Sequence, residues 1–291
     1  MIGRWLALSL ALLLPPAAHA LAQETIPDLL PEIVVEAPGE AQLQGFVGEA
    51  LSHSHKKQLA RWHRPICATL RGFVGGQEQR FARRLQEAAA IAGLEQAPAG
   101  CRPNVIVLLT NDPDRLVDLM LVKHARIFAP APLSAVRRDL GRGGAARFWY
   151  LTISNNAQGN TPDIMDVSGT SVASLMRVAP GNASRIGMAT RADMFRSLVV
   201  LDEKGLRGLP LEAVADHVAL RLLGRIDETE RTPVPSVLNL FQPGGFRPMA
   251  MTDWDRALLR ELYTAPVGAD ADRQRRQIAR RLVETAGDAK Q

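Results

Sequence analysis

Three residues in the C-terminal half of the chain are candidates for an incomplete metal site. His217 and Asp227 could bind zinc through an imidazole nitrogen and a carboxylate oxygen. Arg221 lies four residues after His217, one helical turn away, and its positive charge would repel a divalent metal. His217 and Asp227 are fewer than the roughly three protein ligands that a catalytic zinc needs.

The stretch that carries these residues has the pattern of a buried helix. Apolar residues recur at helical spacing, and further apolar residues fill the opposite side. They are Leu211, Val214, Ala215, Val218, Leu220, Leu222 and Leu223. Pro210 suits the first turn, where its missing N–H costs nothing, and Gly224 suits the left-handed residue at which many helices end. We therefore expect a central helix over residues 209–226.

With His217 as the first position, Gly224 is the eighth and Asp227 the eleventh. This frame resembles the zinc helix of the metzincin metallopeptidases, H-E-x-x-H-x-x-G-x-x-H/D. The resemblance implies that His217 is the first ligand and Asp227 the third, with Val218 in place of the Glu and Arg221 in place of the second His. Hydrolysis needs about three protein ligands and a base, so the implied site is a relict with no catalytic residue, no bound metal and no cofactor.

The segment after this helix widens the resemblance. Residues 235–241 (PSVLNLF) and 251–263 (MTDWDRALLRELY) follow in order. They are similar to the end of matrixin-type metzincins, where a Met turn leads to a helix that opens L-[ST]-x-x-D and closes L-Y. Met249 or Met251 would take the place of the Met turn. The chain is also similar to secreted bacterial domains of unknown function that have a metzincin-like layout.

These patterns predict a non-catalytic metzincin-like protein, a pseudo-metallopeptidase, with a binding or scaffolding role toward an unidentified envelope protein or peptide. A scaffold should bury Val218 and neutralise Arg221 by a link to Asp227 or another acid. An enzyme should instead gather His217, Asp227 and other donors in one polar cleft. The other interpretation of His217 is a partly buried, hydrogen-bonded residue of the core.

The alternative prediction is a hydrolase, either a zinc metallopeptidase with atypical ligands or a serine hydrolase that uses Ser171. Residues 168–174 (SGTSVAS) resemble the nucleophile segment of subtilases, G-T-S-x-A-x-P, with Leu175 in place of the Pro. The Asp and His blocks of that family are missing upstream. Because a serine nucleophile needs a base positioned to take its proton, a polar turn before a strand is the other interpretation of Ser171.

The N-terminus predicts export. Arg4 precedes an apolar run over residues 6–14, and Ala-His-Ala at 18–20 suits cleavage of a signal peptide that spans 1–20. The expected location is periplasmic or secreted. In such a compartment Cys67 and Cys101, the two cysteines of the chain, are expected to form a disulfide, with two buried thiols as the alternative.

The charge pattern does not indicate a nucleic-acid partner. The chain has 35 Lys and Arg against 30 Asp and Glu, a net charge of +5, without a block of five like charges or interleaved aromatic residues. No stretch after the signal is long and apolar enough for a membrane span.

The order of the remaining patterns predicts the fold class α+β: a mixed sheet with packed helices, a zincin-like central helix and a helical C-terminal lobe. Strands are expected at 65–70, 104–110, 147–154, 174–178 and 195–202. Further helices are expected at 44–62, 77–92, 112–128 and 272–286, with a loop at 129–146. A flexible leader over 21–42 would precede the domain at 43–265, and a charged helix or tail would occupy 266–291.

Overall fold

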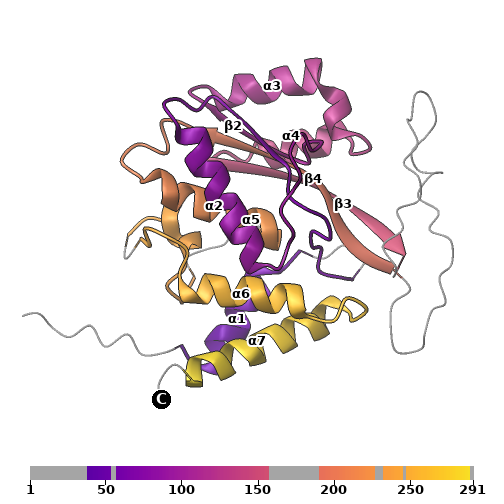
Figure 1. Ribbon diagram of the computed structural model, residues 1–291, viewed down its shortest axis with the longest axis vertical. Coiled ribbons are helices and arrows are strands. Elements are labelled where there is room, and N and C mark those ends of the chain that lie inside the picture. Colours follow the sequence, from indigo (N-terminus) through magenta and orange to yellow (C-terminus); the bar gives the residue numbers. More distant parts are fainter. Residues whose placement is uncertain (1–37, 54–56, 157–189, 227–231, 245–246, 289–291) are drawn as a thin grey trace, which may run out of the picture. The chain divides into compact units, whose positions relative to one another are not determined.

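The computed structural model describes residues 38–53, 57–156, 190–226, 232–244 and 247–288 (Figure 1). Within these ranges, seven α-helices accompany one sheet of four strands, so the chain has the α+β class that the sequence predicts. The expected signal peptide, the expected strand at 174–178 and Ser171 lie outside the described residues.

The sheet is mixed and has the strand order β1-β2-β4-β3. Its members are β1 (Ala68–Arg71), β2 (Val105–Thr110), β3 (Ala146–Asn156) and β4 (Thr190–Asp202). The first two strands run parallel to each other and to β4, whereas β3 pairs antiparallel with β4. Parallel neighbours need a crossover, and helix α2 (Gln77–Ile91) supplies it between β1 and β2.

Successive side chains of β4 point to opposite faces of the sheet, and each face packs against its own hydrophobic core. Val199 and Leu201 belong to the core that includes α2 and α5 (Leu211–Gly224). Leu198 and Val200 belong to a second core under three short helices. These helices are α3 (Pro113–Lys123), the 3-10 helix η1 (Ala125–Phe128) and α4 (Leu133–Leu140). Figure 1 shows α3 and α4 on one side of the sheet and α2 and α5 on the other.

The remaining helices extend the first core beyond the sheet. They are α1 (Glu40–Ala50), the 3-10 helix η3 (Val237–Phe241), α6 (Asp253–Thr264) and α7 (Ala271–Asp288). Helix α7 packs against α1 and α6 through the buried Ile278 and Leu282. Helix α5 packs against α2, η3 and α6, so it is enclosed by elements from both halves of the chain.

Two helix predictions were wrong at positions where tertiary contacts decide the backbone. The helix expected over 44–62 ends at Ala50, and near the end of this range the backbone of Arg61 bonds to β4 instead. Arg61 N–H donates to the carbonyl of Ala192, and its own carbonyl accepts from Met194 N–H. The helix expected over 112–128 begins as predicted, with the Asp112 side chain accepting from Arg115 N–H, but α3 ends at Lys123 and η1 follows.

The prediction of a loop over residues 129–146 was also wrong, because helix α4 lies within this range. Pro132 is the N-cap of this helix and Gly141 follows its last residue. Val136 and Leu140 are fully buried in the second core, beside Trp149 of β3. The Pro and Gly residues of this stretch therefore bound a short helix instead of marking a continuous loop.

The expected disulfide is present. Cys67 and Cys101 have an S–S distance of 1.96 Å and join the residue before β1 to the segment before β2. In the part of the chain that the structure describes, no helix combines the length and the apolar character needed to cross a membrane.

We expect the Cys67→Ser, Cys101→Ser double variant to be less stable than the wild type by about 3–4 kcal/mol, because the bridge closes a long loop in the unfolded chain. Urea unfolding of both proteins measures this difference. Intact-mass analysis after alkylation should find no free thiol in the native wild type. Equal stability, or two thiols open to alkylation, would contradict the prediction.

Candidate functional site

Helix α5 is buried around its whole circumference. Every residue from Ala213 to Gly224 is buried, and Val218 and Leu222 have no exposed surface. Three polar side chains of the helix, Asp216, His217 and Arg221, are also buried. A buried polar group costs free energy unless it is hydrogen-bonded, so each of these side chains needs a partner from the surrounding elements.

The carbonyls at the C-terminal end of α5 also accept hydrogen bonds from outside the helix, because the last turn of a helix offers them few N–H partners. Aromatic side chains from three other segments donate hydrogen bonds to them. The bonds run from Tyr150 Oη to Arg221 O, from Trp62 Nε1 to Leu222 O, and from Tyr263 Oη to Leu223 O, each at 3.1 Å. Burial raises the pKa of Tyr263, which keeps its hydroxyl protonated and able to donate.

Helix α5 is two residues shorter at each end than the predicted range 209–226, and its left-handed residue comes one position later than predicted. Gly224 is the last helical residue, and Arg225 takes the left-handed conformation with φ 48°. Close packing accounts for the glycine, since a Cβ at Gly224 would lie 2.9 Å from the side chain of Ile226. Backbone freedom is therefore not what Gly224 supplies here.

His217 is held in one tautomer. Its Nδ1 lies 2.9 Å from the carbonyl oxygen of Val237, and a carbonyl only accepts, so Nδ1 carries the proton. Burial, together with the nearby charge of Arg221, lowers the pKa of His217 to about 3. The ring is therefore neutral at pH 7, and its Nε2 is a bare acceptor. Within the described residues Nε2 has no hydrogen-bond partner.

The carbonyl that orients His217 is itself fixed by Asp255, which has no exposed surface. The Asp255 carboxylate accepts from the backbone N–H of Val237 and of Thr252, both at 2.9 Å, and from Ser236 Oγ–H. Burial raises the pKa of Asp255. The Thr252–Asp255 capping box starts α6, and Asp255 thus also holds η3 against His217.

Arg221 is bound without an ion pair to any described residue. Its Nε donates to the carbonyl of Ile226 at 3.1 Å, and its guanidinium lies 4.0 Å above the ring of Phe148. A cation above an aromatic face is stabilised by the ring quadrupole. Asp227, the acid that the sequence suggested as its partner and as the third ligand, lies outside the described residues.

Asp216 connects α5 to the segment that the sequence compared with a Met turn. Its carboxylate receives two hydrogen bonds from the guanidinium of Arg84 on α2 and one from Met251 N–H. The hydrogen bond with Asp216 raises the pKa of Arg84. Met251 is buried, whereas Met249 is 60% exposed, so Met251 is the methionine that packs in the core.

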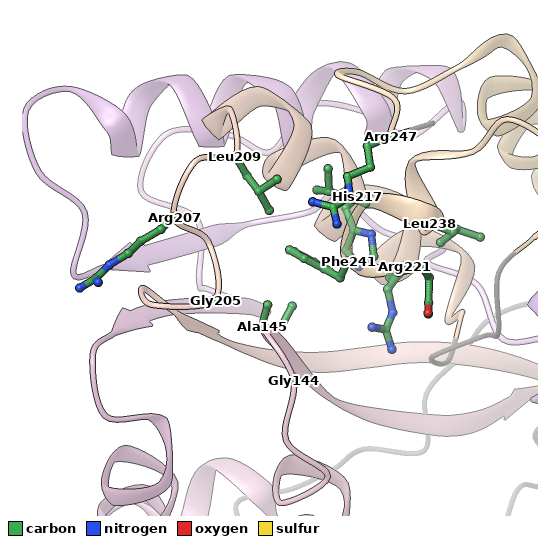
Figure 2. Close-up of a pocket in the computed structure, with 13 residues that line it drawn as sticks. Gly144, Ala145, Gly205, Arg207, Leu209, His217, Arg221, Leu238, Phe241 and Arg247 are labelled. Atoms are coloured by element: carbon green, nitrogen blue, oxygen red, sulfur yellow. The ribbon is translucent and has the colours of Figure 1, made fainter. Parts of the chain in front are cut away.

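His217 and Arg221 line a cavity of about 280 Å³. Its polar side chains include Arg207, Arg221 and Arg247, and its apolar walls come from Leu209, Leu238, Leu240 and Phe241. The rings of Phe241 and His217 meet edge to face with centroids 4.5 Å apart. Figure 2 shows His217, Phe241, Leu238 and Arg221 gathered together, while the side chain of Arg207 extends away from them.

The structure brings together two of the three predicted site residues, His217 and Arg221, at one cavity. Among the described residues, no group of three His, Cys, Asp or Glu side chains converges where a metal could bind. The cavity presents several arginines, and Val218 is not part of its lining. Its chemistry therefore favours an anionic ligand over a cation.

A second polar cluster escaped the sequence analysis. His63 Nδ1 lies 2.8 Å from the carboxylate of Asp193, which also accepts from Asn155 and Arg191 beside a cavity of about 240 Å³. Burial acts to raise the pKa of Asp193, but the hydrogen bonds from His63, Asn155 and Arg191 lower it below its usual value.

The pairing of His63 with Asp193 had no local sequence signal, since the backbone bonds between Arg61 and β4 bring them together. A His oriented by a carboxylate can act as a base. The lining residues that the structure describes include no Ser, Thr or Cys for it to activate. We therefore regard this cluster as a structural tie between the segment before β1 and the sheet.

No protein-family model, curated protein or solved structure matches the chain. Its function is therefore inferred from the geometry of the α5 cavity.

The lowered pKa of His217 predicts loss of stability in acid. Between about pH 6.5 and pH 3 the unfolded chain binds a proton at this residue that the folded chain does not bind. The contribution of His217 to the free energy of unfolding is therefore intact above about pH 6.5 and decreases as the pH falls toward 3. From pH 7 to pH 4 the decrease should be about 3 kcal/mol.

Urea unfolding at several pH values measures this effect, and His217→Asn should have a correspondingly shallower pH dependence than the wild type. His124→Asn is the control, because His124 is exposed. The same pH dependence in His217→Asn and in wild type would contradict the assignment.

Proposed function

We propose that the protein is a non-catalytic metzincin-like protein that binds a partner in the cell envelope through the cavity at α5. The observation that carries this proposal is the replacement of metal-binding chemistry by anion-binding chemistry around His217. The first ligand position of the metzincin frame keeps its imidazole, while the second is the guanidinium of Arg221 beside the same cavity.

The position of Val218 supports the loss of catalysis. In the metzincin frame this residue replaces the Glu that activates the zinc-bound water. Val218 has no exposed surface and belongs to the main core with neighbours such as Val214 and Leu222. An acid placed there would be surrounded by apolar side chains and would not reach a ligand in the cavity.

The binding role is supported by the unused hydrogen-bonding capacity of the cavity. His217 Nε2 is buried and has no partner among the described residues, although buried polar atoms are nearly always paired. An acceptor left open in this way can be satisfied by a ligand. The fixed Nδ1–Val237 bond means that the cavity is already organised to receive it.

An extracytoplasmic location fits this proposal. The disulfide between Cys67 and Cys101 is typical of oxidising compartments, and the sequence of residues 1–20 predicts an exported chain. The partner would then be a protein or peptide of the periplasm or the extracellular space.

We predict that the purified protein holds less than stoichiometric zinc and that Val218→Glu with Arg221→His does not create a zinc site. The buried Glu should lower the free energy of unfolding by about 3–5 kcal/mol. Elemental analysis and urea unfolding measure the two quantities. Val214→Glu is the matched control, because Val214 is a buried valine on the same helix.

If Val218 faced a usable cleft, the double variant would fold like the wild type and gain zinc, while Val214→Glu alone would be destabilised. One tightly held zinc per wild-type chain, lost in His217→Ala, would refute the non-catalytic proposal directly.

We also predict that a fluorophosphonate probe leaves the wild-type protein unlabelled, because the proposed protein has no activated serine. Intact-mass analysis after incubation with the probe detects a single adduct. A serine hydrolase of known activity, incubated in parallel, is the positive control for the probe. Stoichiometric labelling that disappears in Ser171→Ala would revive the serine hydrolase.

A further inference from the structure

The α5 cavity has three kinds of surface, and together they restrict which ligand can bind. It has one buried hydrogen-bond acceptor, His217 Nε2, which lacks a partner among the described residues. It has a guanidinium, that of Arg221, whose described contacts use Nε and the face of the group. It also has a wall of apolar side chains that includes Leu238, Leu240 and Phe241.

The imidazole of His217 favours a ligand group that donates a hydrogen bond. Because Nδ1 donates to Val237 O, the neutral ring offers only a lone pair at Nε2. A carboxylate alone would meet this lone pair with another acceptor, which is repulsive. The ligand group nearest to His217 must therefore carry an N–H or an O–H.

The guanidinium of Arg221, one helical turn from His217, favours an anionic ligand group. Arginine presents several N–H groups in a planar fork that matches a carboxylate, and no described acid occupies it. Arg247 adds a second cation to the same cavity from an exposed position. Residues four apart on a helix are separated by about 5–6 Å between Cβ atoms, so the donor and the anion of the ligand must be close together.

The size of the cavity limits what can enter. Its volume of about 280 Å³ lies just below the range of about 300–1,000 Å³ that is typical of small-molecule sites. One residue fits such a space, but a folded domain does not. A divalent metal would use Nε2 but would be repelled by the arginines, and a phosphate would leave the apolar wall without a partner.

The geometry points to the free C-terminal residue of a peptide as the ligand of this cavity. Its carboxylate would bind Arg221 and Arg247, its backbone N–H would donate to His217 Nε2, and an apolar side chain would pack on Phe241. In such a residue the N–H and the carboxylate are joined through a single Cα, which matches the required proximity. This inference rests on the proposed binding function and gives the chemical class of the partner.

The test is calorimetric titration of the full mature chain with N-acetyl-Ala-Ala-Leu in two forms, the free acid and the C-terminal amide. We expect the free acid to bind at least about tenfold more tightly than the amide, because the amide lacks the charge that Arg221 recognises. Arg221→Met and His217→Asn should each weaken binding of the acid at least about tenfold.

Two further variants keep the result interpretable if Arg221→Met unfolds. Arg247→Met changes an exposed residue of the cavity and should weaken binding of the acid several-fold. Arg83→Met removes an exposed arginine of α2 that does not line the cavity, and should leave binding unchanged. Thermal melts of all four variants establish which of them are folded.

Equal affinity for acid and amide, or equal weakening by Arg83→Met and Arg247→Met, would overturn the assignment. Tighter binding of N-acetyl-leucine or of inorganic phosphate than of the tripeptide would overturn the peptide as the source of the anion. Absence of peptide binding in a zinc-free protein refutes this ligand alone. Peptide cleavage by a protein that holds stoichiometric zinc refutes the proposed function itself.

Discussion

The structure depends on one constraint, which is that a helix buried on every side needs partners from other elements for nearly all its polar groups. Helix α5 places Asp216, His217 and Arg221 in the interior, together with the carbonyls of its last turn. Leaving such groups unpaired would lower the free energy of unfolding by a large fraction of the total stability of a typical protein. Side chains and carbonyls from α2, β3, η3 and α6 therefore converge on α5 and fix its position.

This convergence explains why the C-terminal third folds around α5. Asp255 starts α6 and binds the backbone of Val237, and the carbonyl of Val237 orients His217. Asp216 holds the backbone of Met251, and Tyr263 reaches the end of α5. The same bonds that complete the core also leave His217 Nε2 as a bare acceptor at the cavity. The binding chemistry proposed for the site is thus a consequence of how α5 is buried.

Local sequence patterns predicted the helices and strands whose formation depends on residues close together in the chain. Alternation and continuous apolar runs located the strands, as at residues 104–110, because strand side chains alternate between two covered faces. Two helices begin close to their expected positions, after Asp112 and Thr252, since the side chains of these residues bond to N–H groups three residues ahead. Patterns failed at Arg61, whose backbone pairs with β4, and at residues 133–140, where burial against Trp149 decides the structure.

The sequence by itself predicted a buried helix, which the structure places at Leu211–Gly224, and the pairing of Cys67 with Cys101. The resemblance of this helix to a metzincin zinc helix without its general base and middle ligand stays a prediction. Residue types and helical spacing are enough for those conclusions. Only the tertiary structure decided the tautomer of His217, the placement of Arg221 over Phe148 and the pairing of His63 with Asp193. These properties depend on groups far apart in the chain, and no local spacing encodes which of them meet.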